Sequence, residues 1–231
     1  MKEEFTLQVI ARIESDFMEK FGIPRQSNLV PSLEALVVFE KAYRDENALR
    51  GLEGYSHLWL IWGFSEVKQQ AWSPMVKPPK LGGNKRMGVF ATRSPFRPNP
   101  LGLSSVELLG IEKLPGKGTV LRVAGADLMD GSPIYDIKPY LSFTDSHPEA
   151  RNGFAEALKD NRLPVTFPPE LLERIPQQKQ AALLSALSLD PRPGYLIGRE
   201  DPYGFAYGKY DIRFVVKEGV VQVFDVVEGQ A

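Results

Sequence analysis

The stretch LSSVELLGIEKLPGKGTVLRVAGADLMDGSPIYDI, residues 103–137, decides the fold of this chain. It contains three apolar segments, Leu103 to Ile111, Thr119 to Ala124 and Ile134 to Ile137, separated by Gly, Pro and Asp residues that are typical of turns. Short segments of this composition predict strands. The stretch therefore indicates three strands that follow one another closely.

Four further strands are predicted upstream, the first from alternating apolar and polar residues and the others from short apolar runs. These strands are expected at Phe5 to Ile13, Ala35 to Phe39, Leu58 to Trp62 and Met87 to Thr92. Only Glu40 to Leu49 has helical composition among them, and Gly51 follows at the position of a C-terminal cap. About seven short strands with one helix favour a closed or nearly closed β-barrel over a doubly wound sheet.

The composition becomes helical after the barrel segment. Glu149 to Lys159 and Glu170 to Leu189 are predicted helices, and Pro176 is expected to kink or divide the second one. Ala182 and Leu183 are too apolar for a free surface, so this helix must pack on something.

Strands return at the end of the chain. Phe205 to Lys217 and Val220 to Val227 are predicted strands, joined by a hairpin turn at Glu218-Gly219. We therefore interpret residues 1–148 as a mainly β barrel domain and residues 149–231 as a smaller α+β domain.

The composition excludes several classes of protein. Of 231 residues, 43% are hydrophobic and 25% charged, which is typical of globular proteins and excludes a disordered or fibrous chain. With no cysteine and two histidines, neither disulfides nor a thiolate or His-rich metal site is expected. No apolar run approaches the ~20 residues that span a bilayer, and the acidic amino terminus does not resemble a signal peptide. We expect a cytoplasmic protein without membrane association.

One segment departs from the overall charge balance. The formal net charge is −1, yet Val67 to Val106 contains no Asp or Glu and seven Lys or Arg residues, together with aromatic residues and six prolines. Basic side chains interleaved with aromatic rings on an irregular loop favour nucleic-acid binding. The alternative is a solvated basic loop beside an acidic surface. The residues predicted to contact RNA are Lys77, Lys80, Lys85, Arg86 and Arg97.

Two dense segments carry polar residues suited to ligand binding. In RSPFRPNPLGLS, residues 93–104, three prolines within six positions make the loop rigid. Its two arginines can hold a carboxylate, a phosphate or an adenine face. DLMDGSPIYDIKPY, residues 127–140, places acids, a lysine and two tyrosines around one turn. Such groups can hydrogen-bond a ribose, an ammonium group or an adenine edge, although Asp-Gly-Ser-Pro also forms a plain turn.

The sequence lacks several motifs that mark other classes of enzyme. Sequences for a Rossmann dinucleotide site, a P-loop, a zinc deaminase and a nucleophile elbow are absent. His57 lies within an apolar run, and we interpret it as a core or strand-end histidine rather than a base, because it lacks a visible triad partner.

At the two dense segments the sequence resembles a known family. GVFATRS at 88–94, RPNPLG at 97–102 and DGSPIYDIKPY at 130–140 are similar to the TsaA-like family, whose bacterial two-domain members are the TrmO (YaeB) tRNA methyltransferases. Further similar stretches are KFGIPRQ at 20–26, GLE at 51–53, SHLW at 56–59 and DPRP at 190–193.

This resemblance implies a TsaA-like β-barrel, S-adenosylmethionine as the methyl donor, and a homodimer. The implied reaction is N6-methylation of threonylcarbamoyladenosine at position 37 of threonine tRNA, with the anticodon arm received by the basic segment. The implied donor contacts are Pro24, Arg25, Gln26, Gly63, Phe64, Arg93, Leu103, Asp130, Gly131, Ser132, Pro133 and Ile134.

In such a reaction the sulfonium makes the methyl group electrophilic, so catalysis consists mainly of aligning N6 with the methyl carbon. N6 must also lose a proton, and no residue is marked as the base. The candidates for catalysis are Asn99, Asp136, Lys138 and Tyr140.

Two other classes of function stay open. A non-enzymatic RNA-binding module would use the same basic segment but would bind no methyl donor. A small-molecule hydrolase or isomerase would use Asp127, Asp130 and Asp136 inside the barrel and would need no RNA.

Overall fold

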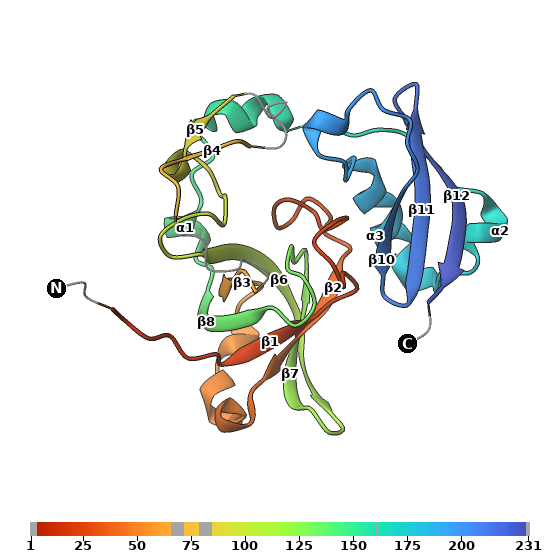
Figure 1. Cartoon of the computed structure of the whole chain (residues 1–231). Coiled ribbons are helices and arrows are strands. Elements are labelled where there is room, and N and C mark those ends of the chain that lie inside the picture. Colours follow the sequence, from red (N-terminus) through yellow and green to blue (C-terminus); the bar gives the residue numbers. More distant parts are fainter. Residues whose placement is uncertain (1–3, 66–71, 79–84, 160, 230–231) are drawn as a thin grey trace.

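The computed structural model describes residues 4–65, 72–78, 85–159 and 161–229 (Figure 1). The chain is predominantly β and contains two hydrophobic cores, one inside a six-stranded sheet and one beside a four-stranded sheet. Among the described residues, no helix is long and apolar enough to cross a membrane.

The first sheet closes on itself. Its strands are β1 (Ala11–Glu14), β2 (Glu34–Phe39), β3 (His57–Gly63), β6 (Leu101–Leu114), β7 (Gly118–Ala124) and β8 (Pro133–Pro139). Every pairing is antiparallel, the order is β1-β2-β7-β6-β3-β8, and β8 pairs with β1 to complete a barrel. A separate ribbon joins β4 (Met75–Val76) to β5 (Met87–Gly88).

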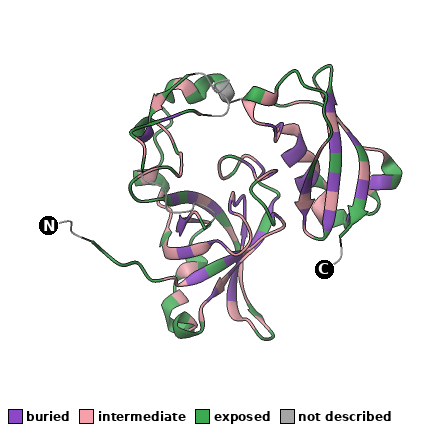
Figure 2. Cartoon of the chain, viewed as in Figure 1, coloured by how far each residue is buried: buried purple, intermediate pink, exposed green. Residues whose placement is uncertain are grey.

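The barrel core follows from alternation along the strands, which Figure 2 shows as purple bands. In β3, Leu58, Leu60 and Trp62 are buried, whereas His57, Trp59 and Ile61 between them are only half-buried. The partner β6 buries Ser104 and Val106 opposite them. Successive side chains of a strand point to opposite faces. The outer face of β3 and β6 is therefore available for other contacts.

Three expectations for this region are corrected. Phe5 is 89% exposed, and the first strand begins only at Ala11, where pairing to both β2 and β8 starts. Glu40 to Leu49 is not an α-helix but two 3-10 turns, Lys41–Tyr43 and Glu46–Leu49, neither of which buries a residue. A helix there would have had no apolar face to pack.

The predicted strand from Met87 to Thr92 is also too long. Only Met87–Gly88 is a strand, and Val89–Ala91 forms a 3-10 turn. The other predicted barrel strands are confirmed within a few residues.

The C-terminal region contains a second sheet with two helices. The short helix α1 (Ser142–Asp145) precedes this region. Its own elements are β9 (Val165–Thr166), α2 (Pro169–Leu172), α3 (Gln177–Ser188), β10 (Tyr203–Tyr207), β11 (Tyr210–Lys217) and β12 (Val220–Glu228). The strand order is β10-β11-β12-β9. The turn predicted at Glu218-Gly219 is present, with both residues at positive φ.

The helical predictions are confirmed in part. Pro176 divides the segment and immediately precedes α3, which buries Ala182 and Leu183. Glu149 to Lys159 instead forms a 3-10 helix at Gly153–Leu158. The predicted strand Phe205 to Lys217 is two strands with a turn between them.

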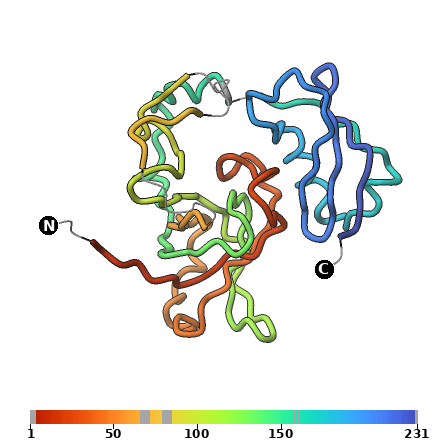
Figure 3. The backbone as a smooth tube through the Cα atoms, in the orientation of Figure 1, coloured from red at the N-terminus to blue at the C-terminus, as the bar shows by residue number. Residues whose placement is uncertain are grey.

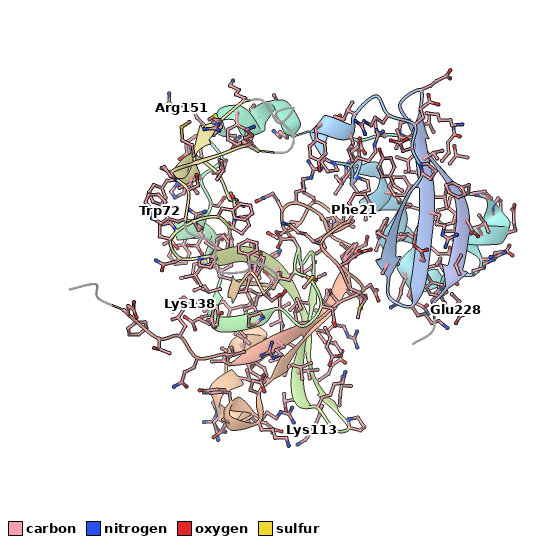
Figure 4. All side chains as sticks on the ribbon, viewed as in Figure 1. Phe21, Trp72, Lys113, Lys138, Arg151 and Glu228 are labelled. Carbon is pink, nitrogen blue, oxygen red and sulfur yellow. The ribbon has the colours of Figure 1, made fainter. Side chains whose placement is uncertain are left out.

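The segment between β1 and β2 connects the two cores. Phe17, Val30 and Leu33 are buried in the same cluster as α3 and the second sheet. The Phe21 ring lies 6.3 to 6.5 Å from the rings of Tyr203, Phe205 and Phe214 and points toward that sheet (Figure 4). The tube in Figure 3 shows this red loop between the barrel and the blue strands.

Candidate active site

Six strand termini meet at one end of the barrel. β1, β3 and β7 end there and β2, β6 and β8 begin there, as the pairs Gly63↔Leu101, Glu34↔Ala124 and Trp62↔Ile134 require. The connecting segments 15–33, 64–100 and 125–132 leave from this end. We call it the barrel mouth.

A hydrogen-bond chain links the barrel core to the mouth. The Trp62 indole Nε1 donates to Ser104 Oγ at 2.9 Å, and Ser104 Oγ donates to Asp127 Oδ1 at 2.5 Å. Burial raises the pKa of Asp127, and hydrogen bonds from Ser104 and from backbone groups, together with the nearby Arg93, oppose this shift only in part. Among the described residues, Asp127 forms no ion pair, and Arg93 is a nearby charge that offsets its burial only in part.

The loop of residues 24–28 lies beside this carboxylate. Arg93 donates through Nη1 to Gln26 Oε1, and Gln26 Nε2 donates to the carbonyl oxygen of Arg25 at 2.5 Å. The Arg25 guanidinium reaches the C-terminal domain and donates to Arg192 O at 2.8 Å. Burial lowers the pKa of Arg25, and the charge of Asp190 partly offsets this. Residues distant in sequence are thereby brought together.

Several other predicted donor contacts also lie at the mouth. The Phe64 ring lies 4.4 Å from that of Trp62, and Leu103, next to Ser104, is 56% exposed. Pro24 is buried in the loop that holds Gln26. Gly63 has a structural explanation of its own, because a Cβ at this position would overlap the Tyr135 ring.

The turn at 130–134 is closely packed against β1 and the residues after it. Asp130 N donates to Phe17 O, Gly131 N to Ile13 O, and Ser132 N to Met129 O, at 2.8 to 3.1 Å. Asp130 Oδ1 accepts from Ser15 N, and Ser132 is 1% exposed. Pro133 and Ile134 start β8. These three amides hold the turn in place, so they are already used before any ligand arrives.

The four catalytic candidates do not form one cluster. Asp136 and Lys138 form an ion pair at 2.9 Å on the outer face of β8, where Figure 4 labels Lys138. The Tyr140 ring lies 5.4 Å from the Trp59 ring and 6.1 Å from the His57 ring. Asn99 is exposed in the loop before β6, and its carbonyl accepts from Leu101 N.

The predicted RNA-contacting residues differ in how they are held. Lys77, Lys85 and Arg86 are exposed, whereas Arg97 donates to the carbonyl oxygens of Thr92 and Ser94 at 3.2 and 3.5 Å and braces its own loop. Lys80 lies outside the described residues. Trp72, labelled in Figure 4, belongs to the same basic segment, and it is 50% exposed.

Sequence reasoning missed a polar hollow outside the barrel. It is lined by Asn28, Ser56, His57, Ser105, Tyr140 and Ser142, of which only Tyr140 was a predicted site residue. The signal was present in Ser56-His57 and Ser104-Ser105, polar pairs at the start of β3 and within β6. Among the described residues, no group of three or more His, Asp or Glu side chains is placed to hold a metal ion.

The chain combines a mainly β barrel, a mouth lined by arginine, glutamine and carboxylate side chains, and a segment rich in Lys and Arg. Comparison with known families then identifies the class of protein. Residues 12–146 match the tRNA-methyltransferase O N-terminal domain, and residues 160–229 match the TrmO C-terminal domain. The chain belongs to the tRNA-methyltransferase O family.

Individual relatives agree across nearly the whole chain. A tRNA (adenine(37)-N6)-methyltransferase of Escherichia coli is 39% identical over 228 residues, covering 95% of this chain and 97% of that protein. RcsF of Pseudomonas aeruginosa, named as an S-adenosylmethionine-dependent methyltransferase, is 36% identical and covers 95% and 96%. A crystal structure of TrmO from Pseudomonas aeruginosa has a TM-score of 0.76 at 31% identity and covers 97% of this chain and all of that one.

Proposed function

We propose that this chain transfers the methyl group of S-adenosylmethionine to N6 of the adenosine at position 37 of tRNA. The observation that carries the proposal is the family match over both parts of the chain, together with relatives of nearly equal length that are named for this reaction. We also propose that the acceptor is threonylcarbamoyladenosine in threonine tRNA, as the sequence resemblance implies.

The residues at the mouth fit this donor chemically. Its amino-acid part carries a carboxylate and an ammonium group, which match the Arg93 guanidinium and the Asp127 carboxylate. Exposed Leu103 and half-buried Phe64 offer apolar surface for the adenine. When bound, the donor supplies a methyl group made electrophilic by the sulfonium.

In this proposal each part of the mouth has one role. Gln26 holds the Arg93 side chain in position, and the chain from Trp62 through Ser104 fixes Asp127. The turn at 130–134 closes the wall of the site through its backbone bonds to β1. Catalysis then consists mainly of alignment, because a bound methyl carbon and a positioned nitrogen need little further assistance.

The basic segment, Val67 to Val106, is proposed to receive the anticodon arm of the tRNA. Lys77, Lys85 and Arg86 are exposed, and Asp and Glu are absent from Val67 to Val106, so a phosphate backbone would meet no opposing charge from this part of the sequence. Lys80 belongs to the same proposal by its place in the sequence, and Arg97 acts by stiffening the loop.

The proposal includes a homodimer and two domains. The basic segment exposes the rings of Trp72, Phe90 and Phe96, of which Phe90 is 74% exposed. A second copy of the chain in a two-fold dimer would cover these rings. Residues 1–148 would carry the donor site and catalysis, with residues 149–231 as a smaller domain. A tRNA substrate supports a cytoplasmic location, which is part of the same proposal.

The experiment is mass spectrometry of tRNA nucleosides from cells with and without this protein. The expected result is loss of N6-methylated threonylcarbamoyladenosine without the gene and its recovery on complementation. Calorimetry of the purified chain with S-adenosylmethionine separates the alternative, since an RNA-binding module without enzymatic activity would give no binding heat. Unchanged nucleosides would contradict the proposal.

A further inference from the structure

The polar hollow on the outer face of the barrel has a volume of about 470 Å³, within the range of pockets that bind small ligands. Among the described residues, six side chains line it and each carries a hydrogen-bonding group. None of these six is Asp, Glu, Lys or Arg. The lining therefore matches a neutral ring with polar edges better than it matches an ion.

Hydrogen bonds fix the shape of this hollow. Asn28 Nδ2 donates to Ser105 O at 3.0 Å, and Asn28 N donates to Gly125 O at 2.8 Å. Asn28 has φ 64°, in the left-handed region that few non-glycine residues adopt. Such a conformation persists where surrounding bonds hold it, and it is frequent at functional sites. One wall is thus held rigidly by contacts to two other segments.

Two of the other lining side chains, His57 and Tyr140, are aromatic. Ser56 Oγ lies 3.0 Å from His57 Nδ1, so one ring nitrogen is engaged within the protein. Tyr140 N donates to His57 O at 2.9 Å, and the Tyr140 ring lies beside the rings of His57 and Trp59. Aromatic faces beside hydrogen-bonding groups are what RNA-binding proteins use to hold an unstacked base.

The hollow extends toward the mouth on its Asn28 and Ser105 side, whereas His57 and Tyr140 lie at the other ends of β3 and β8. Leu103 and Ser105 point to the same outer face of β6, about 7 Å apart along the strand. Gln26 and Asn28 belong to one short loop. A base that enters the hollow from this side would thus face a donor held by Arg93 and Gln26, as transfer between two bound molecules requires.

We propose that this hollow binds the adenine that accepts the methyl group and that His57 takes up its proton, an inference that rests on the function proposed above. The N6 lone pair forms the bond to the methyl carbon as the carbon–sulfur bond breaks and leaves its electrons on sulfur. The proton on N6 passes to His57 Nε2 in the tautomer whose Nδ1–H donates to Ser56 Oγ, since Nε2 then carries the lone pair. The neutral imidazole has the one nitrogen lone pair in the lining that can accept it.

Binding is tested directly by NMR, since the chain has two histidines. His147 is exposed beside Glu149 and acts as an internal reference. The full chain is titrated with the nucleoside threonylcarbamoyladenosine, and with cytidine as a control. We expect threonylcarbamoyladenosine to shift the ring signals of His57 but not those of His147, and cytidine to shift neither. No shift, an equal shift of both histidines or an equal shift with cytidine would overturn the proposal.

Kinetics test the proton transfer. His57→Gln is expected to lower kcat by about 100-fold or more, while KM for tRNA and Kd for S-adenosylmethionine change less than about threefold. Added imidazole should restore part of the activity of His57→Ala. His147→Gln is the matched control and should retain wild-type rates. A folded His57→Gln enzyme with unchanged kcat would remove His57 from the reaction.

Asn28→Gly tests the pocket without threatening the fold, because glycine readily adopts φ 64°. We expect kcat/KM for tRNA to fall about tenfold with donor affinity unchanged, and wild-type kinetics would contradict the pocket. If wild-type protein binds the donor but methylates no adenosine, the proposed function fails. If the wild type is active and His57→Gln and Asn28→Gly are as active as the wild type, only the pocket assignment fails.

Discussion

The barrel mouth holds a half-buried carboxylate, Asp127, and the C-terminal domain a buried one, Asp190, and the two are balanced in charge in different ways. Asp190 accepts from Arg192 Nε at 2.9 Å and Nη2 at 3.1 Å, and the two side chains are 8% and 4% exposed. Asp127 instead accepts from the neutral hydroxyl of Ser104, while the nearby Arg93 donates to Gln26. We call the Asp190 and Arg192 pair closed, because the two side chains bond each other directly. Asp127 and Arg93 instead each bond a neutral side chain, so their charges stay apart.

This difference separates an ion pair that stabilises the fold from charged groups that can bind a ligand. A buried bidentate pair has its charges and hydrogen bonds satisfied within the protein, so it fixes the fold around it. Separated charges at a mouth are only partly satisfied and can be completed by a ligand that carries opposite charges. Buried carboxylates with raised pKa values are enriched at functional sites for this reason. Arg25, bonded to Arg192 O, joins the two regions.

The largest effect is expected on stability, from Arg192→Ala. Removing the guanidinium leaves buried Asp190 without its bidentate partner and breaks the bond from Arg192 Nη1 to Arg199 O. Loss of one member of a buried pair costs about 3–5 kcal/mol, which urea denaturation will measure as a lower unfolding midpoint.

Arg213→Ala is the control for this prediction. Arg213 pairs with Asp211 at 2.9 Å, but its side chain is 47% exposed, so its loss should cost less than about 1 kcal/mol. Equal losses from the two variants would show that the closed pair is no more structural than a surface pair.

The next effect is expected on ligand binding, from Arg93→Ala. A charge-assisted hydrogen bond is worth about 1.5–3 kcal/mol, so calorimetry should find Kd for S-adenosylmethionine raised by about 10- to 100-fold. The urea midpoint should stay close to that of the wild type, because Arg93 is exposed. Arg50→Ala, an exposed arginine among the turns before β3, should change neither quantity. An unchanged Kd in Arg93→Ala would remove this residue from the donor site.

The sequence predicted most barrel strands because short apolar runs bounded by turn residues indicate buried strands. Leu58 to Trp62 is such a run, and in the structure its Leu58, Leu60 and Trp62 are buried. The alternation from Phe5 to Ile13 instead made the first strand too long, since it begins only at Ala11. The helix predicted for Glu40 to Leu49 failed because composition was used without periodicity, and no residue of the two turns found there is buried. Local signals thus sufficed where a whole run was apolar.

Contacts between distant segments had no such signal. Phe17, Val30 and Leu33 are spaced irregularly, yet they complete the core under α3. The bond between Ser104 and Asp127 depends on the pairing of β6 and β7, which sequence does not give. Among site residues, Arg93 and Gln26 were brought together only by the family resemblance, and the partner of His57 was its neighbour Ser56, which no triad pattern would select.

The smallest effect, and the one of opposite sign, is expected from Asp127→Asn. Burial raises the pKa of Asp127 in the folded chain, so the folded state disfavours the ionised form. Stability therefore falls as pH rises from the unfolded value near ~4 through the raised folded value, and the deficit persists above it. Asparagine cannot ionise, and its carbonyl can still accept from Ser104. The variant should match the wild type at low pH and exceed it at pH 7, by less than about 1 kcal/mol. Urea midpoints across this pH range measure the difference. A variant less stable than the wild type at pH 7 would mean that Arg93 already balances this carboxylate and that the mouth is as closed as the Asp190 pair.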